Sequence, residues 1–289
     1  MPSSSIHDLS QELIDKIIDH VGSGDPSRKD LLQCASVSRS FRPRSQTHIF
    51  SSIEIPKNDE TRERKIRILL EILHDNPRIA YYIQELSLDL GSQYWWMARD
   101  KAFIDVMARI STSSKPLRAL TIKAGNILIG CQAFEDPPAD HQPLLDHFFR
   151  PFIIPFITSL YLDWIQNVPT EIVARCINLT DLGLLNVGFM EASAKDRTST
   201  GSHRPKLLRF AYLPHWDLPD LSNMRMLLNP TSNASHSILD FSSLKSFTVY
   251  TDRQQDLEFE QRILDASRES LEEIYIITIE PECKNSCIG

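Results

Sequence analysis

The residues with the greatest chemical potential are cysteines and histidines that lie close together in the sequence. Cys283 and Cys287 are four positions apart, but a zinc site would need a second cysteine pair or a histidine pair at suitable spacing, and none is present. His141 and His147 flank Asp146 in a proline-rich stretch, where we expect a loop with solvated side chains. The sequence therefore predicts no metal site and no cofactor.

The sequence also lacks the motifs that mark common enzyme classes. It contains no G-x-S-x-G nucleophile elbow, no phosphate-binding P-loop and no dinucleotide-binding glycine motif. A hydrolase or transferase with a degenerate motif is the alternative, and a deep pocket lined by converging titratable groups would support it. We expect a protein that is not an enzyme.

Composition and charge limit the classes of partner. The chain has 289 residues, of which 42% are hydrophobic and 24% are charged, as in ordinary soluble domains. Its net charge of −7 disfavours a nucleic-acid surface, which needs clustered Lys and Arg. A basic cluster at residues 62–67 is typical of a solvated helix face. We therefore expect no nucleic-acid partner.

The sequence shows no sign of a membrane segment or a secretory route. The most apolar stretch, residues 148–162, is interrupted by Arg150, Pro151 and Pro155 and is too short to span a bilayer. The first five residues lack the charged and apolar regions of a signal peptide. The five cysteines are odd in number and dispersed, which favours reduced thiols. We expect a cytoplasmic or nuclear location, or both, and no membrane partner.

The elements that could position a site begin with a compact helical unit between residues 8 and 50. Apolar residues at three- and four-residue steps predict a first helix from Gln11 to Val21, and turn residues at 22–26 end it. The apolar stripe of this helix comprises Leu13, Ile14, Ile17, Ile18 and Val21. This stripe is wider than packing against two short helices requires, so we expect part of it to face a protein partner.

Two further short helices complete the unit. The second is predicted to begin near residues 27–30, and the third to run from Arg44 to Ile49 after a break at Pro43. The apolar positions of the second helix are Leu31, Leu32, Ala35 and Val37. A unit of this size buries little surface and needs a partner or a neighbouring domain for stability. The alternative is a purely structural cap on the domain that follows.

The order of these features resembles the F-box. The segments Leu9–Val21 and Leu31–Phe41 are similar to the two apolar helices of that family. Arg42-Pro-Arg-Ser45 and Phe50-Ser-Ser-Ile53 are similar to the end of F-boxes in mushroom-forming fungi. Two residues depart from the family pattern, since Ser10 replaces a usual proline and Phe41 a frequent tryptophan.

The resemblance implies docking on the Skp-type adaptor of a cullin–RING ubiquitin ligase. The residues that match the family's contact positions are Leu9, Leu13, Ile14, Ile17, Ile18, Leu32, Val37 and Phe41. We therefore expect a substrate receptor of a Skp–cullin–F-box ligase with an unknown protein substrate. The alternative is a repeat scaffold that never meets a ligase.

From residue 83 onward, a six-residue phrase recurs with apolar residues at its first, fourth and sixth positions. Seven copies begin at Ile83, Leu117, Ile157, Leu179, Leu207, Leu244 and Leu271. Each copy is typical of a turn that enters a short strand with alternate side chains buried. The copies are 22 to 40 residues apart, and three of the six steps fall within the range of about 20–29 residues that leucine-rich repeats use. Helices fit between the strands at Met97–Ile110, Pro169–Cys176 and Asp256–Ser267.

The sequence thus predicts an α+β to α/β fold. It would comprise an F-box helical module at 1–55, a linker helix within 56–80, and an irregular leucine-rich-repeat-like solenoid with a parallel sheet at 81–289. A doubly wound α/β domain is the alternative. The repeated strand phrase, and the lack of a glycine-rich turn after Leu90, favour the solenoid.

Five aromatic residues close to the ends of predicted strands are candidates for substrate contacts. Residues just past the strands of a solenoid lie along one rim, and Trp and Tyr are enriched at interface hot spots. The candidates are Tyr94, Trp95, Trp96, Trp164 and Trp216. The alternative is that these rings fill gaps in an irregular core.

Overall fold

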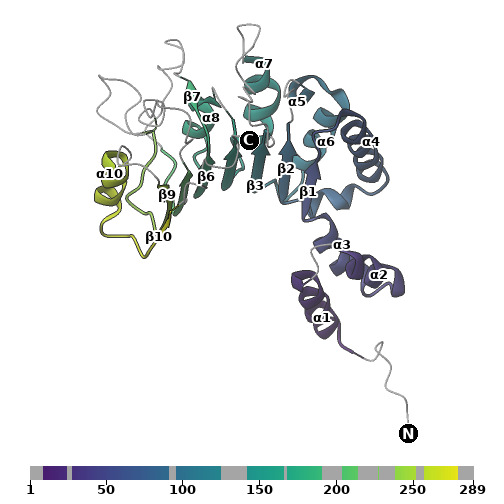
Figure 1. Ribbon diagram of the computed structural model, residues 1–289. Helices are drawn as coiled ribbons and strands as arrows, with labels where there is room; N and C mark the ends of the chain where they lie inside the picture. Colours follow the sequence, from purple (N-terminus) through teal and green to yellow (C-terminus); the bar gives the residue numbers. More distant parts are fainter. Residues whose placement is uncertain are drawn as a thin grey trace, which may run out of the picture.

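The fold is a mixed arrangement of helices and strands built on one parallel sheet of eight strands (Figure 1). The computed structural model describes residues 9–24, 28–90, 96–124, 142–165, 168–190, 204–213, 227, 238–251 and 257–278. In spatial order, the strands are β1 (Ser52–Ile55), β2 (Glu85–Asp89), β3 (Ala119–Lys123), β4 (Ser159–Asp163), β6 (Asp181–Leu185), β8 (Arg209–Leu213), β9 (Ser246–Thr251) and β10 (Glu273–Thr278). A small second sheet pairs β5 (Val168–Pro169) with β7 (Phe189–Met190).

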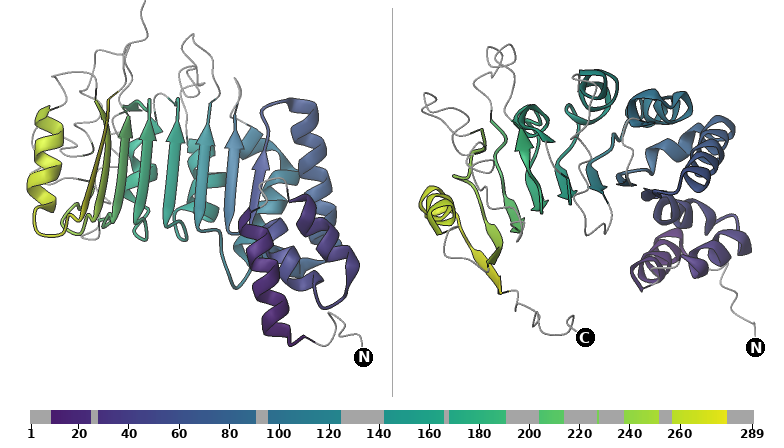
Figure 2. Two further views of the ribbon diagram at one scale, coloured as in Figure 1. Left: turned by 60° about the horizontal axis from the view of Figure 1, so that its bottom comes forward. Right: turned by 45° about the horizontal axis from the view of Figure 1, so that its top comes forward.

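The order of the strands in the main sheet follows their order in the chain. The connecting helices lie together on one face, and the sheet curves so that its other face is concave (Figure 2). These helices are α4 (Asp59–Asp75), η2 (Pro77–Tyr81), α5 (Trp96–Arg99), α6 (Lys101–Ser111), α7 (Gln142–Leu144), η3 (Leu145–Ile153), α8 (Thr170–Ala174) and α10 (Leu257–Ser267). A doubly wound sheet would reverse its strand order and carry helices on both faces. Neither feature occurs in the described part of the chain.

The register between strands follows the repeated phrase, which confirms the seven predicted strands. The fourth-position residues form one continuous column across the sheet, namely Leu86, Leu120, Leu160, Leu182, Phe210, Phe247 and Ile274. The sixth-position residues form the next column, namely Leu88, Ile122, Leu162, Leu184, Tyr212, Val249 and Ile276. Both columns are buried from β2 to β9. Because the parallel strands share one register, side chains at equivalent positions of neighbouring strands lie next to each other.

An eighth copy of the phrase forms β1, which the sequence analysis did not predict. It consists of Phe50, Ile53 and Ile55, and it pairs Ile53 with Leu86 and Ile55 with Leu88. Ile55 is buried in the core of the sheet. The expected boundary at residue 55 is therefore misplaced, because the chain enters the sheet at Ser52.

The segment 56–80, predicted as a linker helix, also packs onto the sheet. Asn58 caps α4 by accepting a hydrogen bond from the Thr61 amide at 3.0 Å, and α4 buries Ile66, Leu69 and Leu73 in the main core. Arg62 was expected on a solvated face, but it pairs with Asp59, and its guanidinium lies 4.9 Å from the ring centre of Trp96. α4 is therefore the first helix of the sheet domain rather than a linker. Arg62 is itself buried.

A helix replaces the loop that was expected around Asp146 and His147. η3 is π-helical, and it buries Phe148, Phe149 and Ile153 in the main core. Its Arg150 joins Asp146 to Glu171 of α8, with Nη2 2.8 Å from Glu171 Oε1. The apolar run 148–162 thus begins in a core helix and ends in β4, whereas His141 lies outside the described residues.

The last strand, β10, departs from the predicted burial pattern. Ile274 and Ile276 were expected inside, but they are 50% and 65% exposed. Within the described residues no helix covers β10, whereas α10, which precedes it in the chain, packs its Phe259 and Ile263 into the main core. Alternation along a strand therefore predicts burial only where a covering layer exists.

We expect substitution by alanine to cost more stability at strand positions that helices cover than at positions that they leave exposed. Leu160→Ala removes a side chain that is fully buried, so it should lower the free energy of unfolding by about 2–5 kcal/mol. Ile276→Ala on the uncovered strand should cost under about 1 kcal/mol. Urea denaturation with equal slopes for both variants would measure the difference. Equal losses would contradict the assigned burial.

Candidate docking surface on the helical module

Three helices form the N-terminal module, as predicted. They are α1 (Gln11–Gly24), α2 (Lys29–Val37) and α3 (Arg42–Phe50). α1 continues through the glycines that were expected to end it. Pro43 was expected to interrupt the helical pattern before the third helix. It lies instead in the first turn of α3, where a missing amide hydrogen costs nothing.

The module has a hydrophobic core of its own, separate from that of the sheet. Its buried members are Ile14, Ile18, Leu31 and Phe41. Three residues predicted to contact an adaptor, Ile14, Ile18 and Phe41, are therefore core residues in this chain. The physical reason is that α2 and α3 pack against α1 and cover one side of its apolar stripe.

The other side of the stripe is open. Leu13 and Ile17 on α1 are 48% and 42% exposed, and Leu9, just before the helix, is also exposed. An open groove of about 400 Å³ runs along this side, lined by Leu9, Leu13, Lys16, Ile17, His20 and Val21. Leu32 and Val37 on α2 are exposed as well. Five of the eight predicted contact residues thus reach solvent, and apolar surface of this kind marks sites of protein interaction.

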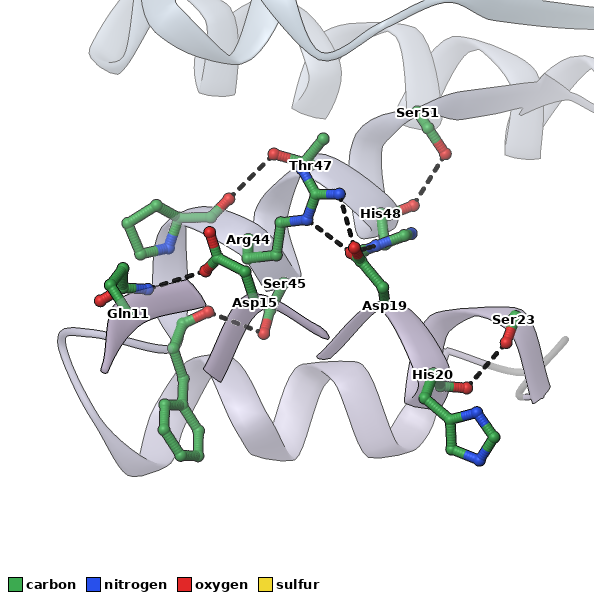
Figure 3. Close-up of polar contacts among 12 residues, drawn as sticks. Gln11, Asp15, Asp19, His20, Ser23, Arg44, Ser45, Thr47, His48 and Ser51 are labelled. Atoms are coloured by element: carbon green, nitrogen blue, oxygen red, sulfur yellow. Dashed lines mark hydrogen bonds and ion pairs between the residues drawn. The ribbon is translucent and has the colours of Figure 1, made fainter. Parts of the chain in front are cut away.

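A charged cluster fixes α1 against α3. Arg44 and His48 of α3 converge on the Asp19 carboxylate, with Arg44 Nη2 and His48 Nε2 each donating at 2.7 Å (Figure 3). Hydrogen bonds from Arg44 and then His48 lower the pKa of Asp19 from 3.8 to about 2. Asp19 lies one residue after Ile18, so this cluster holds Ile18 inward and turns Ile17 toward solvent.

Close contact between α1 and α3 also depends on Gly22. A Cβ atom at this position would lie 2.8 Å from His48 Nδ1, and the His48 ring is held by Asp19. At Gly24, two residues further on, an added Cβ would meet nothing within 4 Å. Gly22 therefore sets the distance between the two helices.

The module is joined to the sheet through the end of α3. Arg28 Nη1 donates to the carbonyl oxygens of Ile49 and Ser52, at 2.7 and 2.9 Å. A cation at the last carbonyls of a helix also interacts favourably with the helix dipole. Because β1 begins at Ser52, the same bonds tie α2 to the first strand of the sheet.

The aromatic candidates for substrate contacts have mixed outcomes. Trp96 is buried, and its ring packs edge-on against Phe103 with centroids 4.8 Å apart, so its predicted role as a binding anchor is wrong. Trp164 is half-buried beside the main core and has a left-handed backbone with φ 56°. Tyr94, Trp95 and Trp216 lie outside the described residues. For Trp96, filling the core was the correct alternative.

The described ranges contain few groups that could carry out chemistry. In these ranges, no cluster of three or more His, Cys, Asp or Glu side chains is placed to hold a metal ion. Burial raises the pKa of the Cys176 thiol to about 12, which keeps it protonated and unreactive at neutral pH. No described helix has the length and apolar character needed to cross a membrane. The exposed face of α1 and α2 is therefore the strongest candidate for a functional site.

We expect Gly22→Ala to destabilise the module by about 1–3 kcal/mol, because the new methyl group collides with a fixed imidazole. Gly24→Ala is the matched control, and it should leave stability unchanged or slightly higher, since alanine favours helix. Hydrogen exchange of α1 amides would measure both. Equal protection in the two variants would show that Gly22 does not set the helix spacing.

The Asp19 cluster predicts a pH dependence. Because the pKa of Asp19 in the folded chain, about 2, lies below the ordinary value of 3.8, its stabilising effect is complete above the ordinary value and is lost as pH falls through the folded one. Asp19→Asn should therefore weaken α1 protection at neutral pH, by an amount reduced by solvent screening. The difference from wild type should vanish toward pH 2. A constant difference at all pH values would contradict the role of the charge.

Comparison with known proteins gives no further guidance, since no protein-family model, curated protein or solved structure matches this chain. A function must therefore rest on the residues and their geometry.

Proposed function

We propose that this chain is a substrate-receptor adaptor of a Skp–cullin–F-box-type ubiquitin ligase. Residues 9–50 would act as the F-box and dock on the Skp-type adaptor. The curved sheet with its helices would act as an irregular leucine-rich-repeat-like solenoid that holds a protein substrate. The chain would supply proximity between substrate and ligase and no covalent chemistry of its own.

The observation that carries this proposal is the divided apolar stripe of α1. One side, with Ile14 and Ile18, completes the core of the module, and the other side leaves Leu13 and Ile17 about half exposed. A helix that served only as a structural cap would gain nothing from this second apolar side. Its exposed residues coincide with positions that the F-box resemblance assigns to the adaptor contact.

The two departures from the F-box pattern are compatible with docking. The carbonyl of Ser10 accepts hydrogen bonds from the Leu13 and Ile14 amides, both at 3.1 Å, so α1 begins properly without a proline. Phe41 is buried, and its replacement of the frequent tryptophan therefore affects the core of the module instead of its surface. The departure at Phe41 therefore leaves the exposed face unchanged, whereas Ser10 is itself exposed next to Leu9.

The sheet supports the proposal through its regularity. Eight phrases in one register, with strands in chain order and helices on one face, are typical of leucine-rich repeats. Such folds present extended curved surfaces to protein partners. The described residues offer this broad surface and no converging set of titratable groups around a deep pocket.

Point variants on the exposed side of α1 test the proposal. Leu13→Asp and Ile17→Asp each introduce a charge at a half-exposed site, so the fold should persist while affinity for a purified Skp-type adaptor falls at least about tenfold. Ile68→Asp on α4 is the matched control, because Ile68 is 47% exposed and lies far from the module core. Isothermal titration calorimetry would compare the three.

The alternative outcome is specific. If wild type does not bind the adaptor, or if Ile17→Asp binds as tightly as wild type, the module is a structural cap on a non-ligase repeat scaffold. Ile18→Asp would not discriminate, because burying a charge at this position would unfold the module. Deleting residues 1–50 would not discriminate either, because it would also remove Phe50, which packs against the core of the sheet.

A further inference from the structure

The concave face of the sheet presents side chains that the fold itself does not need. Residues at the third and fifth positions of each phrase point away from the helices, because side chains alternate along a strand. The residue directly after the phrase, called the seventh position below, points the same way. No described helix or strand packs over this face (Figure 2). The outward side chains on the concave face can therefore contact a binding partner.

The part of this face over β1 to β4 is acidic. Four carboxylates occupy its outward positions against one basic side chain. The carboxylates are Glu54, Glu85, Asp89 and Asp163, and the basic residue is Lys123. An excess of negative charge on a concave surface attracts and orients a positively charged partner.

Three of these charges form a row at the seventh position. Asp89 pairs in register with Lys123, and Lys123 with Asp163, on neighbouring strands. Lys123 forms no ion pair within 4.0 Å with any described residue, and Asp89 Oδ1 is buried without a hydrogen-bond partner among them. Burial raises the pKa of Asp163, an effect that the charge of Lys123 only partly opposes. The row thus holds two partly desolvated carboxylates whose charge is incompletely compensated.

An aromatic ring flanks the row. Tyr161 is two residues before Asp163 on β4, and its ring covers Gly183 of β6 so closely that a Cβ atom there would collide with it. The ring therefore lies low on the concave face and leans over β6, on the side of β4 away from Lys123. A guanidinium can pair with a carboxylate and stack on an adjacent ring at once, which favours arginine over lysine as the group to be bound.

We propose that the concave face over β1–β4 binds a basic segment of a protein, and that one arginine of this segment pairs with Asp163 near Tyr161 while a second basic residue pairs with Asp89 on β2. Binding of such a segment goes beyond adaptor docking. Only the identification of the bound protein as a ligase substrate rests on the proposed function.

The test measures fluorescence anisotropy of a short labelled peptide of alternating arginine and serine, titrated with the full chain at physiological ionic strength. The double variant Asp89→Asn, Asp163→Asn preserves side-chain volume and should weaken binding about tenfold or more. Lys123→Met removes the competing cation and should strengthen binding several-fold. The matched control is Glu60→Gln with Glu71→Gln, which makes the same change of net charge on exposed positions of α4 and should leave affinity within about twofold.

Each outcome decides the proposal. If the α4 control variant weakens peptide binding as much as the double aspartate variant does, the proposal is overturned in favour of non-specific attraction. Tighter binding of a peptide of alternating lysine and serine than of the arginine peptide would overturn it in the same way. If calcium ions displace the peptide and require the same two aspartates, the row is a cation site instead. Leu13→Asp should bind the peptide as wild type does, so a failure of adaptor docking and a failure of this proposal are distinguishable.

Discussion

The structure depends on the burial of two apolar columns that run across the parallel strands in a single register. Each strand supplies one residue to each column, and both columns are buried from β2 to β9 beneath the helices on one face. Burial at about 25 cal/mol per Å² of apolar surface makes these columns the main source of stability. Because the register is common to all strands, it also dictates the opposite face. Residues at the alternate positions must line up there in rows, and one such row is Asp89, Lys123 and Asp163.

The strands could be predicted from sequence because each phrase carries its own burial pattern. The pattern predicted seven strands with correct register, and it missed β1 only because Phe50, Ile53 and Ile55 also fit the end of a helical module. It misjudged β10 because alternation in one strand contains no information on whether a neighbouring helix covers it. The helix at Leu145–Ile153 was missed because prolines and a histidine pair suggested a loop.

The candidate site could be predicted only as a set, without its division into core and surface. A stripe of apolar residues gives the width of a helix face, whereas its partition depends on where neighbouring helices pack. Here the cluster around Asp19 and the absence of a side chain at Gly22 decide that Ile18 is inside and Ile17 is outside. These contacts join residues up to 29 positions apart, so periodicity alone could not reveal them. The F-box identity and adaptor binding stay predictions.

The connection between module and sheet matters for any adaptor role. α3 ends at Phe50 and β1 begins at Ser52, so no flexible linker separates the two parts. Arg28 bonds on both sides of this junction, and Phe50 packs against the core of the sheet. A receptor that presents a substrate to a distant enzyme gains effective concentration only if the orientation between its two binding surfaces is restricted. The direct passage from helix to strand supplies that restriction, and it follows from the same repeated phrase that builds the sheet.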